Sequence, residues 1–369
     1  MTKKMTDTFR FRRGLELKNR ILMAPMTVKM SYYDEVVTHD ESDYYALHSG
    51  EVGAVITAAT SVQANGKGWE GSLAIYDDKF IPGLTRLASA IKKNGTKAIL
   101  QIFHAGRMTN STVLRGQSPV SASAVAAERP DAEIPKALSE TEILELIESF
   151  KSATKRAIKA GFDGVELHGA NTYLLQQFFS PHSNRRDDAW GGTLEKRFKF
   201  INDVVDGVIE SVDQSGVKDF IVGYRFSPEE YEKPGISMED SIILIDKLAD
   251  KKLDYLHISL GKYNSVSRNT NFNEKSRMAY VQEKINGRVP LIGVGDVRTR
   301  EDVNGVLANA DLVAVGRSLL IDPKWTSKLL NGQEETIKRT LAKNDREKLM
   351  VSDGAVEFLR DMMPERLVD

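Results

Sequence analysis

The chain has no cysteine among its 369 residues, and its charges almost cancel, with 51 basic and 52 acidic side chains. The lack of cysteine excludes disulfides, thiolate zinc sites, iron–sulfur clusters, c-type haem and cysteine nucleophiles. It also fits a reducing compartment, so we expect a cytoplasmic protein. The charge balance argues against nucleic acid or an anionic membrane as partner. No apolar run approaches the roughly 18 residues of a membrane helix, and the basic N-terminus lacks the apolar core of a signal peptide.

Short apolar runs rich in β-branched residues recur along the chain, and amphipathic segments lie between them. The runs lack polar alternation, which is typical of parallel strands covered on both faces. We expect strands at 20–25, 53–60, 96–103, 162–167, 219–226, 253–259, 289–294 and 311–315. We expect helices at 79–93, 139–159, 193–212, 237–251, 274–285 and 299–308, with a weaker one at 40–49. Ser139 and Glu142 form a capping box at the start of the 139–159 helix.

Eight strand–helix repeats favour a closed (β/α)₈ TIM barrel over an open doubly wound α/β sheet. A bare barrel takes roughly 250 residues. The surplus is therefore expected in loop insertions after the first three strands and in a C-terminal helical tail, with 118–136 as the most evident insertion. No low-complexity linker divides the chain, so we expect residues 1–369 to form a single domain.

Polar residues gather just after the fourth expected strand, and active sites of barrels lie at such strand ends. His168, Asn171 and Tyr173 follow one another within six residues there. Histidine and asparagine can both direct N–H donors at one oxygen and polarise a carbonyl. A tyrosine nearby can deliver a proton to the adjoining carbon. One such residue alone would more often be structural, but the three together favour catalysis.

The other strand ends carry weaker signals. Gln101 suits the edge of a flat heterocycle, and Arg225 needs either a structural carboxylate or an anionic cofactor beside it. The loops after strands seven and eight contain Gly293-Val294-Gly295 and Gly316-Arg317. Their position matches the phosphate site common to this fold. We interpret His104 and Arg107 as members of a buried structural network.

One motif falsely suggests a dinucleotide-binding site. Residues 66–71, GKGWEG, match G-x-G-x-x-G, but the residues that follow do not open a helix, which a dinucleotide site requires. We interpret this segment as a loop. No spacing of His, Asp and Glu nominates a metal site.

The stretch 167–200, LHGANTYLLQQFFSPHSNRRDDAWGGTLEKRFKF, resembles the signature region of the old yellow enzyme family. APMT at 24–27, QIFHAGR at 101–107, YRFS at 224–227 and VGR at 315–317 support the resemblance, which covers nearly the whole chain. It implies a (β/α)₈ barrel with tightly but non-covalently bound FMN and with NAD(P)H as hydride donor. It also implies a ping-pong reaction in which hydride passes from the reduced flavin to the β-carbon of an α,β-unsaturated carbonyl.

The resemblance also assigns roles to residues. It implies a cofactor site made of Ala24, Pro25, Met26, Thr27, Ala59, Gln101, Arg225, Gly293, Val294, Gly295, Gly316 and Arg317, the last five at the phosphate. His168 and Asn171 would bind the substrate carbonyl or a phenolate, and Tyr173 would be the proton donor. Lys29 stands where an aromatic residue often meets the substrate.

The chain departs from the family pattern at four positions. Thr27 stands where some members have cysteine, Asn171 where others have histidine, Lys29 where an aromatic is common and Trp190 where tyrosine is usual. Two alternatives to the flavin enzyme remain open. One is a barrel isomerase or aldolase acting on a phosphorylated metabolite, and the other is a catalytically silent flavin-binding protein. The resemblance further suggests a homodimer or homotetramer acting on a small molecule.

Overall fold

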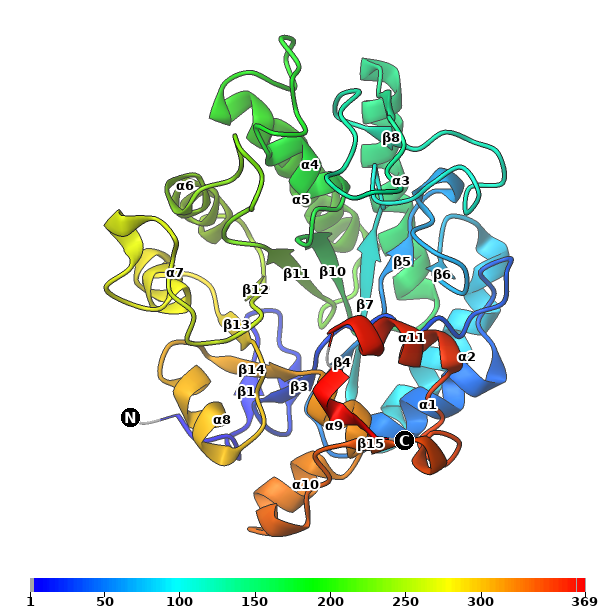
Figure 1. Ribbon diagram of the computed structural model, residues 1–369, viewed down its shortest axis with the longest axis vertical. Helices are drawn as coiled ribbons and strands as arrows, with labels where there is room; N and C mark the ends of the chain where they lie inside the picture. The colour runs from blue at the N-terminus through cyan, green and yellow to red at the C-terminus, as the bar shows by residue number, and fades with distance from the viewer. Residues whose placement is uncertain (1–2, 363, 369) are drawn as a thin grey trace.

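The computed structural model describes residues 3–362 and 364–368, and a closed ring of eight parallel strands lies at its centre (Figure 1). The ring strands, in order, are β3 (Ile21–Met23), β4 (Ala54–Ile56), β7 (Lys97–Phe103), β10 (Gly164–Gly169), β11 (Ile221–Phe226), β12 (Tyr255–Ile258), β13 (Leu291–Val294) and β14 (Leu312–Val315). Pairing of β14 with β3 closes the ring, with Val313 opposite Ile21. The predicted (β/α)₈ barrel is confirmed: seven of the predicted runs contain one of these strands, and the run at 162–167 overlaps β10, which extends to Gly169.

Helices surround the ring, and all but the last of them connect successive strands, while α9 follows β14. They are α1 (His39–Ser49), α2 (Ile81–Lys92), α3 (Glu140–Lys159), α5 (Leu194–Ser215), α6 (Met238–Ala249), α7 (Arg277–Ile285), α8 (Arg300–Leu307) and the short α9 (Arg317–Ile321). The capping box of α3 is confirmed, because Ser139 Oγ accepts a hydrogen bond from Glu142 N and the Glu142 carboxylate accepts one from Ser139 N. Such a cap contributes about 1 kcal/mol to the free energy of unfolding.

Insertions account for the remaining length. Short strands occur as β1 (Phe9–Arg10), β2 (Glu16–Leu17), β5 (Thr60–Ser61), β6 (Leu73–Ala74), β8 (Val120–Ser121), β9 (Lys136–Ala137), β15 (Leu341–Ala342) and β16 (Leu367–Val368). Additional helices are α4 (Leu174–Phe179), α10 (Trp325–Leu330) and α11 (Asp353–Met362), with 3₁₀ turns at Ala64–Gly66, Asp78–Phe80, Thr270–Phe272, Glu334–Thr336, Lys343–Asp345 and Pro364–Arg366. The predicted insertion at 118–136 and the helical tail are both present.

The N-terminal hairpin closes one end of the barrel. Phe11, Leu15 and Leu17 are buried in one cluster with inward-facing residues near the starts of the strands, among them Ile221 and Tyr255. The rings of Phe11 and Tyr255 lie 5.9 Å apart. Because this plug fills the N-terminal mouth, a ligand can approach the barrel interior only from the carboxyl ends of the strands.

Candidate active site

A cavity of about 650 Å³ opens at the carboxyl ends of the barrel strands. Its volume lies within the range usual for small-molecule and cofactor sites. It is lined by Ala24, Pro25, Met26, Thr27, Ala59, Trp69, Gln101, His168, Asn171, Tyr173, Arg225, Ser259, Leu260, Gly261, Val294, Gly295, Asp296, Val297, Ala314, Gly316, Arg317, Ser318, Leu320, Leu359 and Arg366. Residues from both ends of the chain and from most of the strands therefore meet in one space.

His168 and Asn171 both have a free donor at this cavity. His168 Nδ1 accepts a hydrogen bond from Ala170 N at 3.3 Å, which leaves the proton of the neutral ring on Nε2. Burial, with Arg225 and His257 nearby, holds the pKa of His168 well below its ordinary value. The ring is therefore a neutral N–H donor at physiological pH, not a cation.

Asn171 is oriented by a short chain of hydrogen bonds. Arg225 Nη2 donates to Ser259 Oγ at 3.1 Å, and Ser259 Oγ donates to Asn171 Oδ1 at 3.0 Å. Because the amide oxygen is taken, the amide nitrogen of Asn171 is left as the group that can donate to a ligand. Two N–H donors, one from His168 and one from Asn171, can thus bind the same oxygen.

Tyr173 stands beside this donor pair. Its ring packs edge-on against the His168 imidazole, with centroids 4.8 Å apart, and against Phe103 at 5.1 Å. Burial raises the pKa of Tyr173 to about 12, with Arg129 and Arg225 opposing the shift. The phenol therefore keeps its proton, as a general acid must before it transfers one.

Below the donor pair, a buried carboxylate organises the polar interior. Glu166 accepts hydrogen bonds from Gln101 Nε2 at 2.7 Å and from His257 Nδ1 at 2.8 Å. Burial by itself would raise the pKa of Glu166, but His257, Arg225 and Gln101 together lower it. Since the Gln101 amide nitrogen is engaged, the side-chain oxygen of Gln101 is the atom left to accept a bond from a ligand.

Arg225 is not neutralised by a direct ion pair within the part of the chain that the structure describes. Its side chain is 8% exposed, and its Nε has no hydrogen-bond partner there. A buried guanidinium with an unused donor is costly unless an anionic or strongly polar ligand completes it. Of the two alternatives for Arg225, this geometry favours a ligand over a structural carboxylate.

The loops after β13 and β14 form the opposite part of the cavity. Gly295 has φ +142°, and a Cβ there would lie 2.4 Å from Tyr263 N. A side chain at position 295 is thus excluded by both conformation and space. Gly316 directly precedes α9, and Arg317 Nη2 binds Asp296 Oδ1 at 3.0 Å. The glycines let a phosphate group approach the backbone closely, and the neighbouring guanidinium of Arg317 can bind its oxygens.

Two adjacent left-handed residues, Asn171 (φ 55°) and Thr172 (φ 65°), shape the loop between His168 and Tyr173. This conformation costs roughly 1–2 kcal/mol per residue, so neighbouring groups must hold it. Gln176 Oε1 accepts from Thr172 N at 3.0 Å, and Gln177 Nε2 donates to Thr172 O at 2.6 Å. Both polar atoms of the Thr172 backbone are thus bound by the two glutamine side chains of α4.

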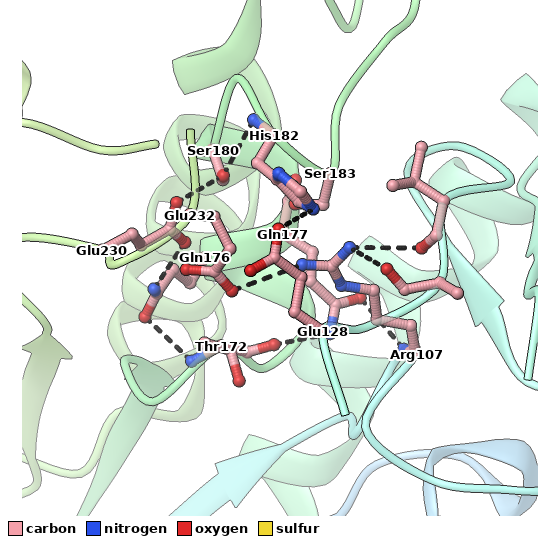
Figure 2. Close-up of polar contacts among 12 residues, drawn as sticks. Arg107, Glu128, Thr172, Gln176, Gln177, Ser180, His182, Ser183, Glu230 and Glu232 are labelled. Carbon is pink, nitrogen blue, oxygen red and sulfur yellow. Dashed lines mark hydrogen bonds and ion pairs between the residues drawn. The ribbon is translucent and has the colours of Figure 1, made fainter. Parts of the chain in front are cut away.

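The two glutamines are themselves anchored in a buried polar network (Figure 2). Gln177 Oε1 accepts from Arg107 N at 3.1 Å and from Ser121 Oγ at 3.0 Å, while Gln177 Nε2 also donates to Ala105 O. Gln176 Nε2 donates to Glu230 Oε1 at 2.7 Å. The network links the catalytic loop to β8 and to the loop after β11, and it contains Arg107, as the sequence predicts.

The structure gathers the predicted site residues with two exceptions. Gly293 does not line the cavity, and a Cβ there would lie 2.5 Å from Val306 Cγ1, so this glycine allows β13 and α8 to pack closely. Lys29, with φ 49°, lies against Gly354 of α11 and not in the cavity. Its assignment as a substrate-binding residue stays a prediction. Trp190 is buried in the outer core, where Lys199 lies over its ring.

Sequence reasoning missed several lining residues. Trp69 belongs to the loop at 66–71, which the sequence analysis rejected as a dinucleotide site, yet Trp69 lines the cavity and its ring lies 6.4 Å from that of Tyr173. A lone aromatic in a glycine-rich loop was the available signal. Ser259 follows β12, the one strand end from which no residue was nominated. Leu359 and Arg366 lie far along the C-terminal tail, and no local pattern marks them.

The residues present fit FMN. The unused Arg225 donor and the Gln101 oxygen suit the polar edge of an isoalloxazine, and the glycine loops with Arg317 suit its phosphate. Among the residues that the structure describes, no group of three or more His, Cys, Asp or Glu could hold a metal ion. Fold and site together are those of a flavin-dependent barrel oxidoreductase.

Comparison with known proteins agrees with this class. The model of the NADH:flavin oxidoreductase / NADH oxidase family matches residues 9–336, and the chain belongs to this family. It is 44% identical to a "probable NADH-dependent flavin oxidoreductase" of Bacillus subtilis (strain 168), over 94% of this chain and 93% of that protein. Morphinone reductase has a similar structure, with a TM-score of 0.77, 27% identity and 90% of each chain covered.

A further relative is much longer than this chain. The NADH:acrylate oxidoreductase of Vibrio harveyi is 46% identical over 89% of this chain, but the match spans only 33% of that protein. The isomerase or aldolase alternative is overturned by the family match. In the part of the chain that the structure describes, no helix has both the length and the apolar character needed to cross a bilayer.

Proposed function

We propose that the protein is an FMN-dependent NAD(P)H oxidoreductase of the ene-reductase type, which reduces α,β-unsaturated carbonyls or related acceptors by a ping-pong mechanism. The observation that carries the proposal is the pair of free donors on His168 and Asn171 beside the protonated hydroxyl of Tyr173. Bound FMN supplies the hydride chemistry. The family match and the likeness to morphinone reductase support the proposal.

Each residue of the site has a role in this proposal. His168 and Asn171 bind the carbonyl oxygen and stabilise the negative charge that develops there. Tyr173 delivers its proton to the α-carbon. Arg225 and Gln101 hold the polar edge of the flavin, and Arg225 also orients Asn171 through Ser259. The remaining cofactor contacts are those of Ala24, Pro25, Met26, Thr27, Ala59, Val294, Gly295, Gly316 and Arg317, which all line the cavity.

A single cavity serves both substrates in this scheme. NAD(P)H and the oxidant bind in turn in this same cavity, so no separate dinucleotide-binding domain is needed. Residues 1–369 accordingly act as one FMN-binding domain. A dimeric or tetrameric assembly is proposed from the family resemblance, and a cytoplasmic location from the lack of cysteine.

The proposal is tested with the purified chain of residues 1–369. We expect a flavin absorbance band in the visible, which NAD(P)H bleaches under anaerobic conditions and 2-cyclohexenone restores. A colourless protein that does not take up added FMN would refute the proposal. Bleaching without recovery by any of a panel of enones, acrylate, quinones and nitro compounds would instead indicate a flavoprotein without ene-reductase activity.

Gln177→Glu is expected to slow enone reduction up to about 100-fold, because a misplacement of about 1 Å in the reacting groups can cost that much. The substitution keeps the shape of the side chain but removes the N–H donor to Thr172 O and Ala105 O. Stopped-flow traces should show slower flavin reoxidation by enone and unchanged FMN affinity. Gln214→Glu, at an exposed position of α5, is the matched control. Equal slowing of both half-reactions would show that Gln177 has only a general structural role.

A further inference from the structure

The C-terminal segment, residues 351–362 and 364–368, reaches into the candidate active site although it lies beyond the residues that the family model matches. Leu359 of α11 and Arg366 of the following 3₁₀ turn both line the cavity. In Figure 1 this segment, in red, crosses in front of the barrel strands. Hydrogen bonds hold the segment in place at both ends. Ser352 Oγ donates to Val28 O at 2.6 Å, and β16 pairs with β15.

Arg366 is buried, with 5% of its surface exposed, and its Nε has no hydrogen-bond partner among the described residues. Its nearest carboxylate is Asp296, with 3.9 Å between Arg366 Nη2 and Asp296 Oδ1. That separation is too long for a hydrogen bond. A buried guanidinium in this state is costly unless another anion completes it.

Asp296 cannot be that anion alone, because two other arginines already bind it. Arg317 Nη2 lies 3.0 Å from Asp296 Oδ1, and Arg298 Nη2 lies 2.9 Å from Asp296 Oδ2. Glu365, 3.7 Å from Arg298, is the other carboxylate paired with this cluster. Asp302 is a further carboxylate near Arg298, which does not line the cavity. The two guanidinium groups that do line it, those of Arg317 and Arg366, have Asp296 as their shared carboxylate within 4 Å among the described residues, and this leaves an excess of positive charge on the cavity side. Burial, and then Arg298 and Arg317, lower the pKa of Arg366, as expected for crowded cations.

The excess charge lies at the part of the cavity that the glycine loops form. Arg317 and Arg366 both line the cavity there, next to Gly295 and Gly316, whereas Arg298 does not line it. Two guanidinium groups beside exposed backbone are suited to a phosphate dianion, which offers several acceptor oxygens to separate donors. A singly charged carboxylate would offset less of the excess.

We propose that Arg366 is a second guanidinium ligand of the FMN phosphate, so that the C-terminal segment of the same chain completes the cofactor site. The proposal rests on the proposed function, since it requires FMN as the cofactor. It assigns to the tail a part in cofactor binding that the barrel loops do not fulfil alone, and it predicts that the segment discriminates FMN from riboflavin, which has the same ring system without the phosphate.

The test measures flavin binding to the chain of residues 1–369 after its bound flavin has been removed, with the quenching of flavin fluorescence as the signal. Arg366→Gln is expected to weaken FMN binding by about 10- to 100-fold, the usual effect of losing a hydrogen bond to a charged group. Riboflavin binding should be unchanged. Arg366→Lys should recover part of the FMN affinity. Arg360→Gln, at an exposed position of α11, is the matched control and should bind both flavins as the unmodified chain does.

The outcomes separate the two proposals. If Arg366→Gln binds FMN as tightly as the unmodified chain, or loses FMN and riboflavin affinity equally, Arg366 is not a phosphate ligand and the inference fails while the proposed function stands. If the unmodified chain binds no flavin, both fail. Thermal unfolding of each variant without flavin shows whether a loss of affinity reflects misfolding. If Arg366→Gln is misfolded, the Arg366→Lys variant decides: it should bind FMN more tightly than riboflavin, and equal affinities for the two flavins would overturn the inference.

Discussion

Tyr173→Phe is expected to slow the reoxidation of the reduced enzyme by an enone by about 10²- to 10⁴-fold, the range in which general acids usually act. The reduction of the enzyme by NAD(P)H should keep its rate, because that half-reaction needs no proton from the chain. The reason lies in the geometry. Tyr173 lies beside His168, and its raised pKa, about 12, keeps the hydroxyl protonated at neutral pH.

Stopped-flow spectroscopy of the two half-reactions checks this expectation. Tyr280→Phe removes a hydroxyl from α7, away from the cavity lining, and serves as the control with unchanged rates in both steps. An equal loss in both half-reactions of Tyr173→Phe would mean that the residue shapes the pocket and does not donate the proton. Quinones and free flavin, which need no carbon protonation, should remain good oxidants of the variant.

His168→Ala is expected to weaken the binding of p-hydroxybenzaldehyde and similar phenols by about 10- to 100-fold, as for loss of a hydrogen bond to a charged oxygen. Phenolates bound over oxidised flavin give a long-wavelength charge-transfer band, so titration of this band measures the affinity. His168 acts here as a neutral donor, because burial, Arg225 and His257 hold its pKa low. Enone reduction should fall as well, since one of two oxyanion donors is lost.

The control for this variant is His39→Ala, an exposed position at the start of α1. Its charge-transfer titration should match that of the unmodified chain. An unaltered band in His168→Ala would remove this residue from the oxygen-binding site and leave Asn171 as the only donor. Asn171→Ala would then be expected to abolish phenol binding entirely.

The repeating pattern made the barrel predictable. Eight apolar runs with helices between them are a local property, and each run contains or overlaps a strand of the ring. The elements that were missed are those whose stability does not come from their own sequence. The hairpin strands β1 and β2 have two residues each. Helix α4 has six residues, and all six are buried. Such short elements form because the barrel packs against them.

The same distinction holds at the site. His168, Asn171 and Tyr173 lie within six residues, so their proximity and chemistry were readable from the chain. Their orientation was not. The free donor of Asn171 depends on Ser259, 88 positions away, and the strained Thr172 depends on the side chains of Gln176 and Gln177. Gly293 also depends on a distant contact, because it allows β13 to pack closely on α8, and its assignment to the phosphate stays a prediction.

The sequence by itself determined the fold class, the absence of thiol chemistry and the group of residues at the end of β10, because periodicity, composition and short spacings act within a few turns of chain. Only the tertiary structure decided which nitrogen of His168 carries the proton, whether Arg225 is satisfied and that Arg366 reaches the cavity. These facts depend on contacts between residues far apart in the chain, which exist only once the barrel has closed and the C-terminal segment has packed across its mouth.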